Sequence, residues 1–117
     1  MKSVRVFQVA YDQARVYDRA RLLRQHGCHV QSVIGNDAAK VMLSGRPYYD
    51  VFIIGSDGPE EMRREMVRWL RRNYPGQRIL DLNPTANRKL DGLKYNARTD
   101  SPSEWLQLIE GAASSRR

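Results

Sequence analysis

The sequence has one cysteine and two histidines, and it contains no long apolar run. Cys28 cannot form an internal disulfide, and with only His26 and His29 beside it the chain has too few soft ligands for a structural zinc site. The longest uninterrupted apolar run, Val-Phe-Ile-Ile at residues 51–54, is far shorter than the roughly 18 residues that a membrane span needs. The low cysteine and histidine content excludes a disulfide scaffold and a zinc-stabilised domain, and the short apolar run excludes a membrane-spanning helix.

The composition is ordinary for a folded domain, with 41% hydrophobic and 28% charged residues in a chain of 117. Single domains cluster near 100–150 residues, so we expect one domain over residues 1–112 and a flexible tail over 113–117. The N-terminal residues begin the strand–helix pattern directly, and they lack the apolar segment and small-residue cleavage site of a secretory signal. We therefore expect a cytoplasmic protein.

The net charge is +7, from 20 Lys and Arg against 13 Asp and Glu, and 16 of the cations are arginine. Such an excess favours a nucleic-acid or acidic-protein partner. Arginine content can also reflect the base composition of a genome, so on charge alone nucleic acid is the weaker alternative.

Short β-branched segments alternate with amphipathic segments along the chain. The predicted strands are residues 3–10, 28–34, 50–55, 78–82 and 92–97. Residues 83–91 are polar and too few for a helix with two loops, so the fourth helix is expected to be short or absent. Repeated strand–helix alternation requires right-handed crossovers and a sheet covered on both faces. The predicted fold class is α/β: a doubly wound, flavodoxin-like domain with a five-stranded parallel sheet in the order 2-1-3-4-5.

Helical spacing predicts which face of the first helix is buried. Val16, Ala20 and Leu23 recur at three- and four-residue intervals, whereas Arg15 and Arg19 are placed on the solvent side. The first helix is therefore predicted to be an amphipathic surface helix.

The third helix is predicted to begin at Pro59 and to show the same division between a buried and an exposed face. Its inner stripe is predicted to be Met62, Met66, Trp69 and Leu70. Its outer face is predicted to be Arg63, Arg64, Arg68, Arg71 and Arg72. Trp105, in the last helix, is also expected to pack in the core, with docking on a helix face as the alternative.

Three segments resemble a receiver domain of the two-component response-regulator family. Tyr-Asp-Val-Phe-Ile-Ile at residues 49–54 is similar to the third receiver strand, and Leu-Leu-Arg-Gln-His-Gly at 22–27 to the end of the first helix. Residues 92–105, with Ser101-Pro102, resemble the last strand, loop and helix. The resemblance covers residues 3–112 and implies a CheY-like fold and a bacterial signalling role.

In that family, an acidic pair holds a divalent cation, an aspartate ending the third strand accepts the phosphoryl group, and a lysine neutralises the product. A hydroxyl-bearing residue follows the fourth strand. Here the acidic pair falls on Ala10 and Tyr11, with only Asp12 nearby, and the acceptor position falls on Gly55. The hydroxyl position falls near Asn83, and the lysine position close to Arg98. Glycine offers no oxygen to phosphorylate, and one carboxylate is a poor magnesium site. The resemblance therefore implies a degenerate phosphorylation site with no catalytic residue, metal or cofactor.

Two other patterns leave alternatives open. Asp57 could be a displaced phosphoacceptor, although both Asp57 and Asp12 are more simply explained as helix caps. Three Arg-x-x-Asp tetrads, which begin at Arg15, Arg78 and Arg88, resemble a cyclic di-guanylate-binding motif. The first tetrad also fits an ion pair between Arg15 and Asp18 within one helix. No glycine-rich phosphate loop occurs.

The resemblance implies a stand-alone pseudo-receiver: a non-enzymatic module that binds a signalling kinase or an output protein, as a monomer or a weak homodimer. The alternatives are a nucleotide or nucleic-acid binder that uses the arginine-rich surfaces, and an atypical receiver phosphorylated at Asp57. The predicted interaction surface comprises Lys94, Tyr95, Trp105, Arg64, Arg68 and Arg71.

Overall fold

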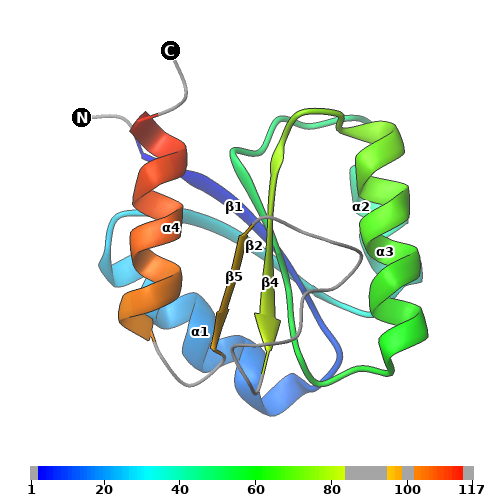
Figure 1. Ribbon diagram of the computed structural model, residues 1–117, viewed down its shortest axis with the longest axis horizontal. Helices are drawn as coiled ribbons and strands as arrows, with labels where there is room; N and C mark the ends of the chain where they lie inside the picture. Colours follow the sequence, from blue (N-terminus) through cyan, green and yellow to red (C-terminus); the bar gives the residue numbers. More distant parts are fainter. Residues whose placement is uncertain (1–2, 84–94, 99–101, 115–117) are drawn as a thin grey trace.

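A computed structural model describes residues 3–83, 95–98 and 102–114 of the chain. Strands and helices alternate through residues 5–83, and one further strand and one further helix follow (Figure 1). The strands are β1 (Arg5–Ala10), β2 (His29–Ile34), β3 (Val51–Ile54), β4 (Arg78–Asn83) and β5 (Tyr95–Arg98). The helices are α1 (Gln13–Gln25), α2 (Asn36–Leu43), α3 (Glu60–Asn73) and α4 (Pro102–Ser114). Helix α4 thus runs past the predicted domain boundary at residue 112.

All strand pairs are parallel, and the strand order is β2-β1-β3-β4-β5. Val9 in β1 lies opposite Ile54 in β3, and Ile54 lies opposite Asp81 in β4. The carboxyl ends of β1, β3 and β4 therefore finish side by side. The predicted α/β class, parallel sheet and order 2-1-3-4 of the first four strands are confirmed. The predicted short or absent fourth helix falls on residues 84–91, outside those described.

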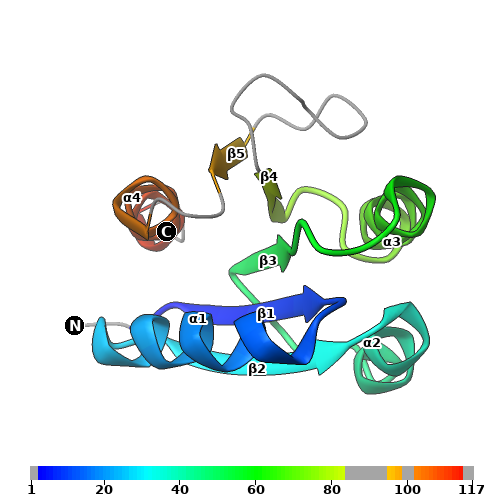
Figure 2. The same cartoon turned by 90° about the horizontal axis from the view of Figure 1, so that it is seen from below.

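The helices cover both faces of the sheet (Figure 2). Helices α2 and α3 pack on one face, over a core that includes Phe7, Phe52 and Leu70. Helices α1 and α4 pack on the other face, where the core includes Leu23 and Trp105. Trp105 is 2% exposed, so the expectation that it packs in the core is confirmed. None of the described helices is long and apolar enough to cross a bilayer.

Helix α1 begins and ends as its sequence predicts. The side chain of Asp12 accepts a hydrogen bond from the backbone N–H of Ala14 at 3.0 Å, which satisfies one of the free donors of the first turn. Gly27 follows the helix with a φ of 84°, a conformation that favours glycine over residues with a side chain. The predicted capping role of Asp12 is confirmed.

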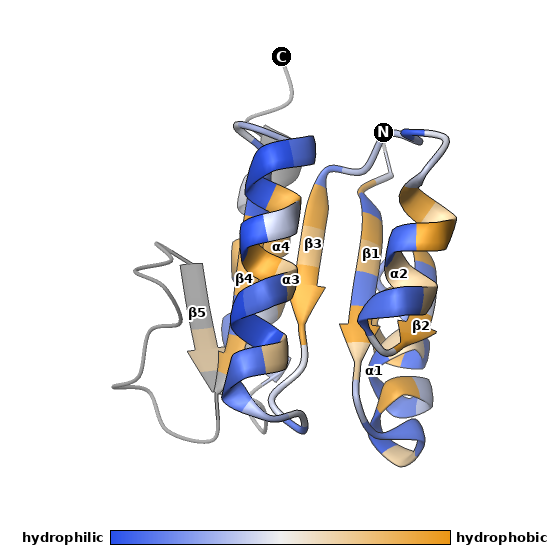
Figure 3. Cartoon of the chain, turned by 90° about the vertical axis from the view of Figure 1, so that its right-hand side faces the viewer, coloured by the Kyte–Doolittle hydropathy of each residue, from blue (hydrophilic) through white to orange (hydrophobic). Residues whose placement is uncertain are grey.

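Helix α3 has a hydrophilic outer side, whereas β1 and β3 are mostly hydrophobic (Figure 3). Its buried residues are Arg63, Met66, Val67 and Leu70, which repeat at intervals of three and four. The prediction was therefore wrong for Arg63, which faces inward, and for Met62, which is 41% exposed. Arg63 can be buried because its guanidinium group has polar partners inside the protein, which are described below.

Candidate functional site

The candidate site lies at the carboxyl edge of the sheet, where parallel α/β sheets bind ligands. The turn after β1 contains Tyr11 and Asp12, and the turn after β3 contains Gly55, Asp57 and Gly58. These two turns therefore bring together Tyr11, Asp12 and Gly55 of the predicted degenerate site. The backbone of Asn83 ends β4 and that of Arg98 ends β5, opposite each other in the sheet.

Gly55 is buried at the centre of this edge. Its backbone N–H donates to the carbonyl oxygen of Val9 at 2.9 Å. A Cβ atom added at Gly55 would lie 3.3 Å from that oxygen and 3.5 Å from a terminal nitrogen of the Arg19 guanidinium. The space into which a side chain at position 55 would point is therefore bordered by a cation.

The guanidinium group of Arg63 contacts the other side of this turn. Its Nε donates to the carbonyl oxygen of Gly55 at 2.8 Å, and a terminal nitrogen donates to the carbonyl oxygen of Leu82 at 3.0 Å. The same guanidinium forms an ion pair with Asp81. Arg63 is 6% exposed and Asp81 is fully buried, so both charges are neutralised inside the protein. One side chain therefore joins α3 to the ends of β3 and β4.

Arg19 is the second buried arginine, at 5% exposure, and its predicted position on the solvent side of α1 is wrong. It donates to Oε1 of Gln8 at 3.1 Å. Gln8 in turn donates to the carbonyl oxygen of Val16 and to Oγ of Ser32. Burial lowers the pKa of Arg19, and the negative charge of Asp57 acts in the opposite direction. Asp57 is therefore a counter-charge for Arg19.

Asp57 does not cap α3, contrary to the prediction. Pro59 occupies the N-cap position of that helix, and no side chain accepts a hydrogen bond there. Oδ1 of Asp57 lies 3.9 Å from Nε of Arg15. Oδ2 is buried and has no hydrogen-bond partner among the described residues. Asp57 therefore interacts with the arginines of α1 rather than with the first turn of α3.

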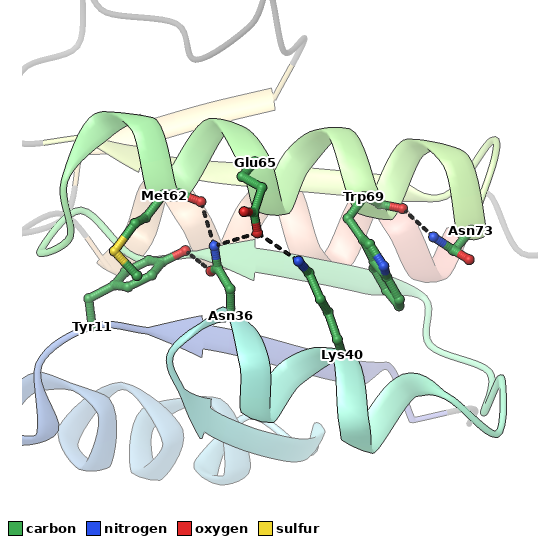
Figure 4. A network of polar contacts seen from close by, with 7 residues as sticks. All are labelled: Tyr11, Asn36, Lys40, Met62, Glu65, Trp69 and Asn73. Carbon is green, nitrogen blue, oxygen red and sulfur yellow. Dashed lines mark hydrogen bonds and ion pairs between the residues drawn. The ribbon is translucent and has the colours of Figure 1, made fainter.

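Tyr11 covers the same turn from the β1 side. Its ring lies so close to Gly58 that a Cβ atom there would be 2.4 Å from a ring carbon. Its hydroxyl donates to Asn36 at 2.7 Å, and Asn36 donates to the carbonyl oxygen of Met62 and to Glu65 (Figure 4). Burial raises the pKa of Tyr11 to about 12. The network joins the β1–α1 turn to α2 and α3.

The carboxylates of this edge are dispersed rather than gathered. Asp12 is exposed and caps α1, Asp57 interacts with Arg15, and Asp81 is bonded to Arg63. Among the described residues, no three His, Cys, Asp or Glu side chains are grouped so that they could hold a metal ion. Magnesium binds to carboxylates and other oxygen ligands. The buried guanidinium groups of Arg19 and Arg63 instead place positive charge around Gly55.

The Arg-x-x-Asp tetrads do not act as units in the described part of the chain. Asp18 pairs with Arg21 at 2.8 Å, so the predicted pair between Arg15 and Asp18 is wrong. Asp81 pairs with Arg63, and Arg78 donates to the carbonyl oxygen of Leu108. The third tetrad, at residues 88–91, lies outside the described residues.

Only some residues of the predicted interaction surface are both described and exposed. Trp105 is buried, so its inclusion in that surface is wrong. On α3, Arg68 and Arg71 are exposed, and Arg64 forms an ion pair with Glu60 at 3.2 Å. Lys94 and the side chain of Tyr95 lie outside the described residues. The described part of the surface is therefore the outer face of α3.

No family model matches the sequence, and no curated protein matches it. Among solved structures, a response-regulator receiver domain from Clostridium thermocellum superposes with a TM-score of 0.83 and 14% identity, covering 97% of this chain and 96% of its own. The chain has the CheY-like receiver fold. A response regulator in complex with the histidine kinase ThkA has a TM-score of 0.79 and 12% identity, covering 93% of this chain and 97% of its own. A putative pilus assembly-related protein from Burkholderia pseudomallei has a TM-score of 0.76 and 22% identity, covering 95% and 90%.

Within this receiver fold, the sequence reasoning missed the two buried arginines. Arg19 lies three residues after Val16 and four before Leu23, and Arg63 lies three before Met66 and seven before Leu70. Both spacings place the arginine on the apolar stripe of its helix. An arginine at a core position requires a buried partner, so the spacing itself was the signal.

Proposed function

We propose that the chain is a pseudo-receiver: a signalling module that binds another protein and is not switched by aspartyl phosphorylation. The observation that supports this most directly is the pair of guanidinium groups around Gly55. Nε of Arg63 is 2.8 Å from the carbonyl oxygen of Gly55, and Arg19 borders the space of its missing side chain.

The chemistry of phosphoryl transfer explains why this arrangement matters. An aspartyl phosphate needs a carboxylate nucleophile and a divalent cation that neutralises the phosphoryl oxygens. Gly55 supplies no nucleophile at the position that the receiver resemblance indicates. Two buried arginines repel a divalent cation, and the carboxylate of Asp81 is already neutralised by Arg63.

Partner binding is proposed from the fold and from the charge of α3. One solved structure of this fold is a response regulator in complex with a histidine kinase. The outer face of α3 carries exposed Arg68 and Arg71 in a chain of net charge +7. We place the contact with an acidic surface of a kinase or output protein on this face, and Lys94 and Tyr95 are further candidates from the sequence.

The test is to treat the full chain with acetyl phosphate and magnesium, alongside a receiver that retains its aspartate. We expect intact-mass analysis to find no acid-labile phosphoryl adduct on this chain. Beryllofluoride with magnesium should leave the amide NMR signals of residues 54–58 unchanged. An adduct, or saturable shifts at those residues, would refute the proposal.

Asp57 is the second candidate, because its Oδ2 atom is buried without a hydrogen-bond partner among the described residues. If an adduct forms on the wild-type chain and is lost in Asp57→Asn, the chain is an atypical receiver. An adduct that persists in Asp57→Asn but is lost in Asp12→Asn places the acceptor in the β1–α1 turn.

A further inference from the structure

A cavity of about 330 Å³ lies at the amino end of the sheet, opposite the edge that carries Gly55. It is lined by residues 28–31 together with Arg5, Arg24 and Tyr49. Consecutive residues of a strand point to opposite faces of the sheet. Residues 28–31 therefore border the cavity from both faces. Together with Arg5 of β1 and Tyr49 before β3, they place it across the amino ends of these strands.

Three basic residues from three elements line this cavity. Arg5 comes from β1, Arg24 from the last turn of α1 and His29 from the start of β2. None of the lining residues that the structure describes is acidic. An arginine guanidinium carries five N–H donors in a fixed plane that matches the oxygens of phosphate and carboxylate groups.

Both guanidinium groups are positioned by the fold. Nε of Arg5 donates to the carbonyl oxygen of Tyr48 at 2.9 Å, and its guanidinium carbon lies 5.4 Å from the centre of the Tyr49 ring. Arg24 donates to the carbonyl oxygen of Val30 at 3.2 Å. These contacts restrict the two side chains, which reduces the entropy that a ligand must overcome to order them.

The nearby carboxylates do not neutralise this charge by ion pairing. Asp50 accepts hydrogen bonds from the backbone N–H of Arg5 and from the hydroxyl of Tyr48. Burial raises the pKa of Cys28, and the negative charge of Glu110, which is exposed on α4, raises it further. Among the described residues, neither Arg5 nor Arg24 forms a salt bridge with a carboxylate.

We propose that this cavity binds a small, multiply charged oxyanion, whose phosphoryl or carboxylate oxygens are held by Arg5, Arg24 and His29. Its volume lies at the lower end of the range for ligand pockets, which suits a compact metabolite rather than a polymer. The Gln31 amide adds a donor, and the Tyr49 ring supplies an apolar wall. The site is separate from the carboxyl edge, so it gives the pseudo-receiver a ligand input that does not depend on aspartyl chemistry.

The test is an amide NMR titration of the full chain with pyrophosphate and, in a parallel arm, with citrate. We expect saturable shifts that are centred on residues 28–31 and Arg5. Stronger binding of pyrophosphate identifies a phosphorylated ligand, and stronger binding of citrate identifies a polycarboxylate. The absence of saturable shifts at these residues at about 10 mM of both anions, well above a millimolar Kd, overturns the proposal.

Matched variants separate a built site from general attraction to a basic protein. Arg24→Gln and Arg5→Gln should each weaken binding about tenfold, as expected for loss of a charge-assisted hydrogen bond. Arg21→Gln removes the same charge from the exposed side of α1, outside the cavity, and should change the Kd less than twofold. Equal weakening by all three variants would show non-specific binding. Circular dichroism confirms that each variant folds, and neither result bears on whether the chain is phosphorylated on an aspartate.

Discussion

Arg63 in α3 and Asp81 in β4 form a buried ion pair, and the same guanidinium binds the carbonyl oxygen of Gly55. Arg63 thus connects α3 to β4 and to the turn that follows β3. Removing one member of such a pair leaves an uncompensated charge in the interior, which is more costly than replacing both members with apolar groups.

We therefore expect Arg63→Met to lower the free energy of unfolding by about 3–5 kcal/mol. The double variant Arg63→Met with Asp81→Leu should be more stable than Arg63→Met alone. The measurement is urea denaturation followed by circular dichroism. Arg72→Met, at an exposed position of the same helix, is the control and should change stability by no more than about 0.5 kcal/mol. A loss for Arg63→Met no larger than that of the control contradicts the prediction.

Gly55→Asp should not restore phosphorylation. The new carboxylate would lie beside the Arg19 guanidinium, which is 3.5 Å from the position of its Cβ atom, and would form an ion pair instead of a magnesium site. Intact-mass analysis after acetyl phosphate and magnesium should find no adduct. The double variant Gly55→Asp with Arg19→Ala tests whether the cation is the obstacle. An adduct on the single variant would show that the arginines do not block the chemistry.

Gly58→Ala should disturb the turn after β3. The added methyl group would lie 2.4 Å from a carbon of the Tyr11 ring, so the ring must move and give up its hydrogen bond to Asn36. We expect a loss of about 1–3 kcal/mol in thermal or urea unfolding.

The control for this prediction is Gly45→Ala, where nothing lies within 4 Å of the new atom. That substitution should cost no more than about 0.5 kcal/mol. In a Tyr11→Ala background, Gly58→Ala should lose most of its effect. An equal cost with and without the ring would show that the strain lies elsewhere.

Tyr11 should make stability depend on pH in the alkaline range. Its phenol has a pKa of about 12 in the folded chain, mainly because of burial, and about 10 in the unfolded chain. Between these values the unfolded state releases the proton first, so stability is complete below about pH 10 and falls as pH rises toward 12.

This pH dependence can be measured by phenolate absorbance together with urea denaturation at several alkaline pH values. Burial also raises the pKa of Tyr74, so both phenols should ionise late. Tyr11→Phe should reduce the alkaline loss of stability, whereas Tyr17→Phe, at an exposed position, should not. An unchanged alkaline profile in Tyr11→Phe contradicts the assignment.

The sequence predicted the fold because apolar periodicity determines which elements form and which faces are buried. Strand β3 reads as four consecutive apolar residues and is fully buried in the middle of the sheet. The capping role of Asp12 was also predictable, because it depends only on local chain geometry.

The arginines at the candidate site were not predicted, because their partners come from distant parts of the chain. Arg19 meets Gln8, and Arg63 meets Asp81, a residue 18 positions away in another element. Charge patterning alone assigned both to the surface. The spacing of each arginine on an apolar stripe was a signal in the sequence. The partners, Gln8 for Arg19 and Asp81 for Arg63, could be identified only from the arrangement of the strands.

The two arginines reach Gly55 from helices on opposite faces of the sheet, Arg19 from α1 and Arg63 from α3. On the proposed function, this geometry makes the loss of phosphorylation hard to reverse by single substitutions. An acid at position 55 meets an arginine that already borders its place, and removal of Arg63 leaves Asp81 without its neutralising charge. On the proposed function, a change to a phosphorylatable receiver would therefore require several of these contacts to change together.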